Sequence, residues 1–164
     1  MVRDNPRMSL TVGEPAPDFT LPRDGGASVS LASLRGKPVV LFFYPKDDTP
    51  GCTLEARDFT ALRPRFESAG AAVLGVSAGD VKGKDKFVRK HGLGVPLLAD
   101  ETTAMLTSYG VWAEKSMYGK TYMGIRRTTV LIDSEGRVAQ VWPVTKVEGH
   151  AEQVLAAVEA MRAG

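Results

Sequence analysis

Two continuous apolar runs dominate the pattern of the chain. Residues Val39 to Tyr44 and Ala71 to Val76 are almost entirely apolar and rich in β-branched or aromatic side chains, which is typical of strands buried on both faces. Between the runs, apolar residues recur every three to five positions, at Leu54, Phe59, Leu62 and Phe66. This spacing predicts a helix that packs on a core, so the region is predicted to be a βαβ unit with parallel strands.

Shorter apolar segments near both ends predict hairpins. Phe19 to Leu21 and Val29 to Leu31 flank a turn of aspartate and two glycines, which predicts a small N-terminal hairpin. Thr128 to Asp133 and Arg137 to Trp142 flank Ser-Glu-Gly, which predicts a second hairpin. Beyond it, the apolar positions from 151 to 161 follow one face of a C-terminal helix.

The central part of the chain has weaker patterns. We predict a helix over Asp80 to His91, a short strand over Val95 to Ala99, and a helix over Glu101 to Tyr109 that Asp100 caps. Val111 to Gly124 has no clean period and is predicted to be a long ordered loop, of the kind that is usually functional or an interface. The order of elements predicts an α/β sandwich with a mixed sheet.

Composition narrows the class of protein. A chain of 164 residues, 43% hydrophobic and 24% charged, fits one globular domain, which we place at 11–164 after a flexible segment over 1–10. The net charge of +2 argues against nucleic acid as a partner, and no apolar run approaches the ~20 residues that span a membrane. Residues 1–9 lack the apolar region of a secretory signal, so we expect a cytoplasmic protein.

The single cysteine, Cys52, excludes an internal disulfide, and two distant histidines give no metal-binding cluster. Cys52 ends the stretch that begins at Pro45, directly after the first apolar run. Thr49 and Pro50 are typical of a helix start, as a hydroxyl N-cap followed by proline at the first helical position. Cys52 therefore falls in the first helical turn, where the dipole and unpaired amides favour a thiolate.

Other groups are predicted to surround this thiolate. The hydroxyl of Thr49 can cap the helix and turn towards the sulfur, and the amides near Gly51 form an anion site. The best candidate for a cation is Arg127, at the start of the strand that begins at Thr128, whereas Arg126 is expected at the surface. Glu55, one turn into the helix, is expected either to interact with the helix dipole or to orient Arg127.

These residues resemble a known family. The motif Pro45-x-x-x-Thr49-x-x-Cys52 is similar to the active-site motif of peroxiredoxins, and the longer stretch from Phe43 to Thr53 resembles the bacterioferritin-comigratory, or Q-type, subfamily. The resemblance extends from about Val12 to the C-terminal helix. Further segments similar to that subfamily are Ala16 to Leu21, Tyr109 to Trp112, Met117 to Lys120, Gly124 to Asp133 and Gly149 to Ala151.

The resemblance implies a thioredoxin-like fold, a central mixed sheet flanked by helices with an N-terminal hairpin extension. It also implies a peroxidase of hydrogen peroxide and organic hydroperoxides that uses no metal, haem or flavin. Cys52 would attack the peroxide and become a sulfenic acid, Thr49 and Arg127 would hold thiolate and peroxide, and Pro45 would shield the sulfur from water. The implied catalytic residues are thus Cys52, Thr49 and Arg127, and the implied substrate-binding residues are Pro45, Gly51 and Tyr44.

The sequence also departs from the family. Many members carry a resolving cysteine five residues after the first, where this chain has Arg57, or in the following helix, where it has none. The resemblance therefore implies a one-cysteine mechanism in which an external thiol reduces the sulfenic acid. Thioredoxin is the family's usual reductant, and glutaredoxin or a low-molecular-weight thiol is an alternative. The subfamily implies a monomer or a weak homodimer.

Two other functions are alternatives to the peroxidase. A thiol–disulfide oxidoreductase of the same fold is disfavoured, because the second cysteine of a Cys-x-x-Cys pair is replaced by Glu55. A redox sensor or chaperone-like protein that signals through oxidised Cys52 stays open as a second role.

Overall fold

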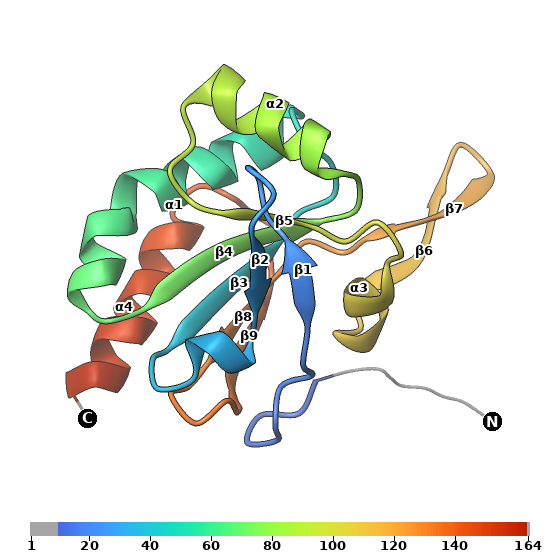
Figure 1. Ribbon diagram of the computed structural model, residues 1–164. Helices are drawn as coiled ribbons and strands as arrows, with labels where there is room; N and C mark the ends of the chain where they lie inside the picture. Colours follow the sequence, from blue (N-terminus) through green and yellow to red (C-terminus); the bar gives the residue numbers. More distant parts are fainter. Residues whose placement is uncertain (1–9, 164) are drawn as a thin grey trace.

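The computed structural model describes residues 10–163 and builds them around a mixed sheet (Figure 1). In this part of the chain the sheet has five strands in the order β5-β4-β3-β8-β9. β3 lies at the centre, parallel to β4 and antiparallel to β8, which confirms the βαβ unit and the C-terminal hairpin. The strands are β3 (Val39–Phe43), β4 (Ala72–Ser77), β5 (Leu97–Ala99), β8 (Thr128–Ile132) and β9 (Val138–Pro143).

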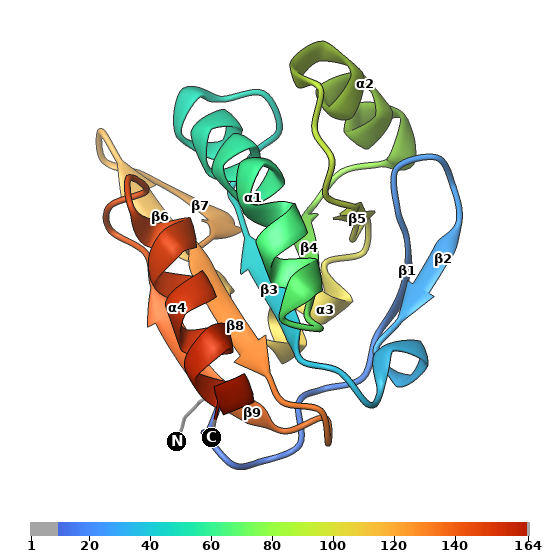
Figure 2. The ribbon, with the colours of Figure 1, turned by 90° about the vertical axis from the view of Figure 1, so that its left-hand side faces the viewer.

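Helices cover both faces of this sheet. α1 and α4 lie side by side on one face, as Figure 2 shows, and α2 extends that layer with Phe87. The other face carries α3, the 3-10 helix η1 and the predicted N-terminal hairpin, β1 with β2. The bounds are α1 (Pro50–Ser68), α2 (Val81–His91), α3 (Ala104–Ser108), α4 (His150–Ala163), η1 (Ala32–Leu34), β1 (Thr20–Pro22) and β2 (Ser28–Ser30).

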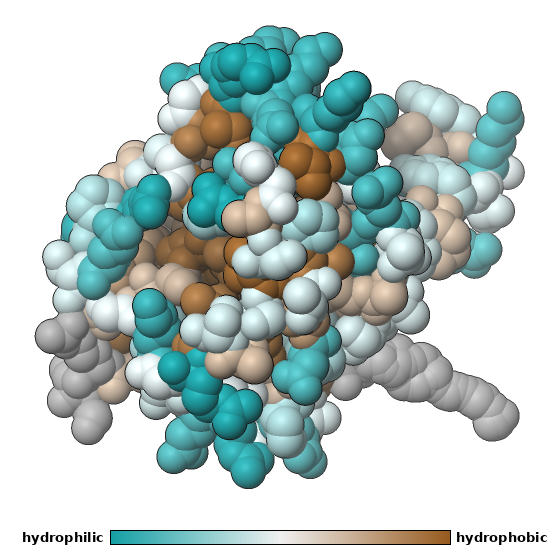
Figure 3. Space-filling model, viewed as in Figure 1, coloured by the Kyte–Doolittle hydropathy of each residue, from teal (hydrophilic) through white to brown (hydrophobic). Residues whose placement is uncertain are grey.

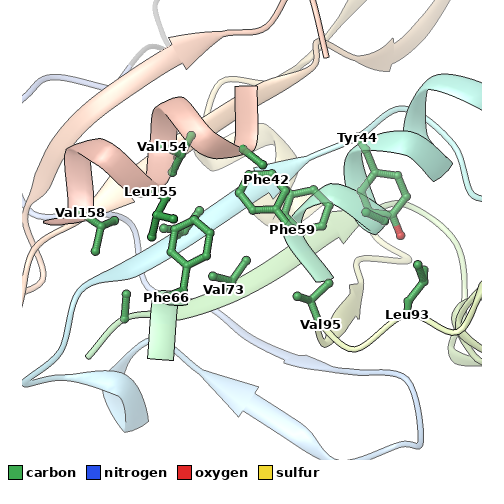
Figure 4. Packing of buried hydrophobic residues seen from close by; sticks show 14 of the residues in the cluster. Phe42, Tyr44, Phe59, Phe66, Val73, Leu93, Val95, Val154, Leu155 and Val158 are labelled. Carbon is green, nitrogen blue, oxygen red and sulfur yellow. The ribbon is translucent and has the colours of Figure 1, made fainter. Parts of the chain in front are cut away.

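Aromatic packing fixes α1 on the sheet (Figure 4). The ring of Phe42 in β3 stacks on Phe59 of α1 with centroids 4.6 Å apart, and Phe66 continues the contact towards α4. All three side chains are fully buried. Burial of each contributes roughly 1.5–3 kcal/mol, so α1 is held firmly against the central strand.

The predicted loop over Val111 to Gly124 is wrong. It is a hairpin of β6 (Trp112–Met117) and β7 (Lys120–Ile125) that projects from the body of the molecule (Figure 1). Its two turn residues, Tyr118 and Gly119, both have positive φ, 54° and 78°. Such turns usually carry Asn-Gly or Asp-Gly, and a tyrosine in the first position hides the signal in the sequence.

The predicted helix over Glu101 to Tyr109 is also partly wrong. α3 begins only at Ala104, because Thr103 before it is left-handed, with φ of 63°. Asp100 is fully buried, and its Oδ2 accepts from the amide of Leu106 in the middle of the helix. It therefore stabilises α3, but the N-cap residue is Thr103 and not Asp100. The predicted flexible segment, 1–10, lies outside the described residues except for residue 10. Within residues 10–163, no helix combines the length and hydropathy needed to cross a bilayer.

Candidate active site

Cys52 lies in the first turn of α1, as predicted. Thr49 is the N-cap residue and Pro50 the first helical residue. The first hydrogen bond into the helix runs from the amide of Thr53 to the carbonyl of Thr49, at 2.8 Å, so the amides of Gly51 and Cys52 precede the hydrogen-bonded ladder. The cysteine is only 1% exposed. Its sulfur therefore sits in a nearly enclosed site at the positive end of a helix.

Arg127 reaches this sulfur from the neighbouring strand. It directly precedes β8, whose first residue, Thr128, pairs with Phe43 at the end of β3. The sheet register thus brings Arg127 beside the start of α1, and its Nη2 lies 3.4 Å from Cys52 Sγ. A Cβ atom on Gly51 would lie 3.2 Å from the same nitrogen, so glycine leaves room for the guanidinium. Arg127, the cation predicted from the sequence, therefore lies beside the sulfur.

Glu55 holds the other side of the guanidinium. Its Oε1 accepts from Arg127 Nη1 at 2.6 Å, and its residue is 1% exposed. Burial raises the pKa of Glu55 to about 7, although Arg127 acts to lower it. Burial acts to lower the pKa of Arg127, but the charges of Glu55 and Cys52 outweigh it and the pKa is raised. A permanently charged arginine is therefore oriented between a carboxyl group and the sulfur.

Glu55→Gln is expected to stabilise the protein at about pH 8 and to have little effect at about pH 5. The pKa of Glu55 is about 7 when folded and near 4.5 when unfolded, so the folded protein loses stability as pH rises from 4.5 through 7. Glutamine removes this cost, which amounts to at most roughly 3 kcal/mol. Urea unfolding of both proteins at the two pH values measures the difference.

Glu67→Gln is the matched control, because Glu67 lies on the same helix, is exposed and pairs with Arg63 one turn away. We expect it to change stability by no more than about 0.5 kcal/mol at either pH. A Glu55→Gln protein that is less stable than the wild type at pH 8 would show that the ionised carboxylate stabilises the fold.

The remaining predicted residues are placed differently. The hydroxyl of Thr49 donates to the carbonyl of Lys46 at 2.9 Å, so the predicted side-chain cap is wrong although the N-cap position is right. Pro45 is half-buried beside the loop. Tyr44 is fully buried, and its hydroxyl donates to Asp47 at 2.7 Å. Tyr44 therefore stabilises the loop through Asp47. Because the side chain is fully buried, its position does not support the predicted contact with substrate.

Some features of the site were not predicted. Lys115 on β6 is half-buried, and burial, followed by the charges of Arg127 and Arg126, lowers its pKa while Cys52 opposes the effect. Its ammonium group thus adds positive potential near the sulfur. The sequence gives no sign of this placement, because the segment that forms the hairpin has no clean period.

The two histidines lie at helix ends. His150 begins α4, is 5% exposed, and its Nε2 lies 2.8 Å from the hydroxyl of Thr129. His91 ends α2 and pairs with Asp48. Across the described range, 10–163, no three His, Cys, Asp or Glu side chains are grouped to hold a metal ion.

Known proteins resemble this chain along most of its length. The model of the AhpC/TSA family matches residues 12–141. Peroxiredoxin Bcp of Xanthomonas campestris is 48% identical over 148 residues, which cover 89% of this chain and 92% of the relative. Peroxiredoxin Bcp of Bacillus subtilis is 42% identical over 154 residues, covering 94% and 98%.

Solved structures agree with these relatives. The bacterioferritin comigratory protein of Xanthomonas campestris, trapped in intermediate and ligand complexes that concern its alkyl peroxide reduction activity, has a TM-score of 0.86 at 44% identity, covering 93% of this chain and 99% of that one. A PrxQ mutant of Xylella fastidiosa has a TM-score of 0.88 at 36% identity, covering 94% and 98%. The thioredoxin-like fold predicted from the sequence is thereby confirmed.

Proposed function

The chain belongs to the AhpC/TSA family, as a peroxiredoxin of the bacterioferritin-comigratory type and hence a thiol peroxidase, and we propose that Cys52 is its peroxidatic residue, with Arg127 and Thr49 as its catalytic partners. One observation carries this assignment. The only sulfur nucleophile of the chain lies in the first turn of α1 with Arg127 Nη2 at 3.4 Å. A cation and a helix start at one sulfur favour the thiolate, which is the reactive form.

The reaction follows from this geometry. The Cys52 thiolate attacks the terminal oxygen of hydrogen peroxide or an organic hydroperoxide, an S–O bond forms and the O–O bond breaks. The leaving oxygen takes a proton and departs as water or an alcohol, and Cys52 becomes a sulfenic acid. Arg127 and the amides of Gly51 and Cys52 face the oxygens on which negative charge develops. We retain Pro45 as the residue that limits access of water, and Thr49 as a contact of the peroxide.

The second half of the cycle needs an external thiol, since the chain has no other cysteine. A thiol attacks the sulfenic sulfur, water leaves, and a mixed disulfide forms. A further thiol then releases Cys52. We propose thioredoxin as this reductant, with glutaredoxin or a low-molecular-weight thiol as the alternative. We also propose that residues 11–164 act as one domain, in the cytoplasm, as a monomer or weak homodimer.

Mass spectrometry tests the assignment directly. One equivalent of hydrogen peroxide is expected to add about 16 Da, one oxygen atom, to the reduced protein within seconds, at Cys52. A sulfenic-acid reagent should trap the product, and added dithiol should restore the original mass. A protein that gains no oxygen over several minutes at neutral pH would contradict the proposal.

A further inference from the structure

A buried lysine lies close to the active site without touching it. Lys84 of α2 is 0% exposed. Its Nζ donates to Asp47 at 3.1 and 3.2 Å, to Ser77 Oγ at 2.6 Å and to the carbonyl of Ala78 at 2.7 Å. It also lies 5.7 Å from the centre of the Tyr44 ring. Burial lowers the pKa of Lys84, whereas Asp47 opposes this effect. A lysine is buried this fully only when its partners are specific.

The partner of this lysine belongs to the loop that leads into α1. Asp47 precedes Cys52 by five residues and also accepts from Tyr44, at 2.7 Å. Burial, and then the charge of Asp47, raise the pKa of Tyr44, so its hydroxyl stays protonated and donates. Asp47 thus joins the end of β3 to the first half of α2.

The next residue of the loop is held by the same helix. Asp48 adopts a left-handed backbone, with φ of 61°, which costs an L-residue free energy and persists only where its surroundings impose it. Its carboxylate accepts from Lys90 Nζ at 2.7 Å and lies 2.6 Å from His91 Nε2. In the view of Figure 3 the surface over α2 is mostly hydrophilic, with smaller hydrophobic areas between the polar groups. Two adjacent carboxylates of the loop are therefore held by Lys84, Lys90 and His91 of one helix.

We propose that Lys84 is a positioning residue for the peroxidase reaction: through Asp47 it holds the turn from Asp47 to Cys52 in the form that places the sulfur beside Arg127. Lys90 and His91 support the same turn through Asp48, but they are more exposed and contribute less. This inference rests on the proposed role of Cys52.

The positioning has a consequence for the whole cycle. A peroxide is small enough for an enclosed site, but a cysteine that is 1% exposed gives a protein thiol no access. Reduction of the sulfenic acid therefore requires the turn to open, and the Lys84–Asp47 pair opposes this opening. Lys84 is thus expected to favour reaction with peroxide and to slow reaction with the external thiol.

Lys84→Met tests this, because methionine preserves length and hydrophobic volume but removes the ammonium group. We expect oxidation of Cys52 by hydrogen peroxide to slow about tenfold, since small misplacements of a reacting group are costly. Once oxidised, the variant should react faster than the wild type with a protein thiol and form less sulfinic acid. Hydrogen exchange should accelerate at the amide of Thr53, the first bonded amide of α1, and stay unchanged at Val158 in α4.

Leu155→Ala is the matched control. Leu155 is buried in α4, at the side of the hydrophobic cluster away from Tyr44 (Figure 4), and its truncation is expected to lower the thermal midpoint without touching the turn. Even where its thermal midpoint falls as much as that of Lys84→Met, the Leu155→Ala variant should keep the wild-type oxidation rate and the wild-type hydrogen exchange at Thr53. A merely structural role for Lys84 would give both variants the same behaviour and would overturn the inference.

If Lys84→Met does not fold, Asp47→Asn replaces it. The amide keeps the shape of the side chain and weakens the pair, so a smaller change in the same direction is expected. Wild-type rates in both half-reactions would overturn the inference about Lys84 alone. Failure of the wild-type protein itself to react with peroxide would instead contradict the proposed role of Cys52, so the two failures are distinguishable.

Discussion

Cys52→Ser is expected to abolish thiol-dependent peroxide consumption while the fold is retained. A serine hydroxyl is not ionised at neutral pH and is a far weaker nucleophile than a thiolate, and the chain has no other cysteine to replace it. Serine is nearly the same size, and Arg127 can donate to its oxygen as it does to the sulfur. We therefore expect the free energy of unfolding to change by about 1 kcal/mol. A coupled assay that follows reductant oxidation measures the activity.

Methionine oxidation is the main complication of this experiment. Met117 and Met123 on the projecting hairpin are 54% and 49% exposed, and a sulfoxide adds the same mass as a sulfenic acid. Oxygen that the Cys52→Ser protein gains should appear slowly and should resist dithiol, whereas the oxygen on wild-type Cys52 is removed by it. If the variant gained oxygen rapidly and dithiol removed it, the reactive group would lie elsewhere in the chain.

The sequence was sufficient to predict the centre of the site because its signals are local or follow from strand order. Thr49 and Pro50 define the helix start, so the position of Cys52 in the first turn follows from neighbouring residues alone. Arg127 is distant in sequence, but it precedes a strand predicted from a clear hairpin pattern. Once β8 pairs with β3, the register brings it to the sulfur.

The surroundings of the site depend on tertiary contacts that leave no such pattern. A lysine among charged residues, such as Lys84, is typical of a solvated helix face, and the sequence gives no sign that it is buried against Asp47. Lys115 approaches the site only through the β6–β7 hairpin, and the turn at Tyr118 lacks the usual residues. The Thr49 hydroxyl likewise donates to the carbonyl of Lys46, a contact within the loop that no sequence pattern indicates.

Arg127→Met is expected to slow the oxidation of Cys52 by peroxide about 10²- to 10³-fold. The guanidinium lies 3.4 Å from the sulfur, and in the proposed reaction it would face the oxygens that become charged as the O–O bond breaks. Loss of one such donor from an enclosed site typically costs about this factor. Stopped-flow measurement of the second-order rate constant, with the neighbouring Arg126→Met as control, tests the effect. Arg126 is exposed, so we expect the rate constant of the Arg126→Met variant to stay within about twofold of the wild-type value.

The same substitution leaves Glu55 buried without its cation. Because Arg127 acts to lower the pKa of Glu55, its loss should raise that pKa above about 7, and stability should fall at higher pH more steeply than in the wild type. The double variant Arg127→Met/Glu55→Gln removes this penalty. It should recover stability at about pH 8 without recovering the rate, because the glutamine restores no positive charge at the sulfur. If the double variant regained the wild-type rate, the slow reaction of Arg127→Met would come from the unpaired carboxylate, and Arg127 would be left with a structural role only.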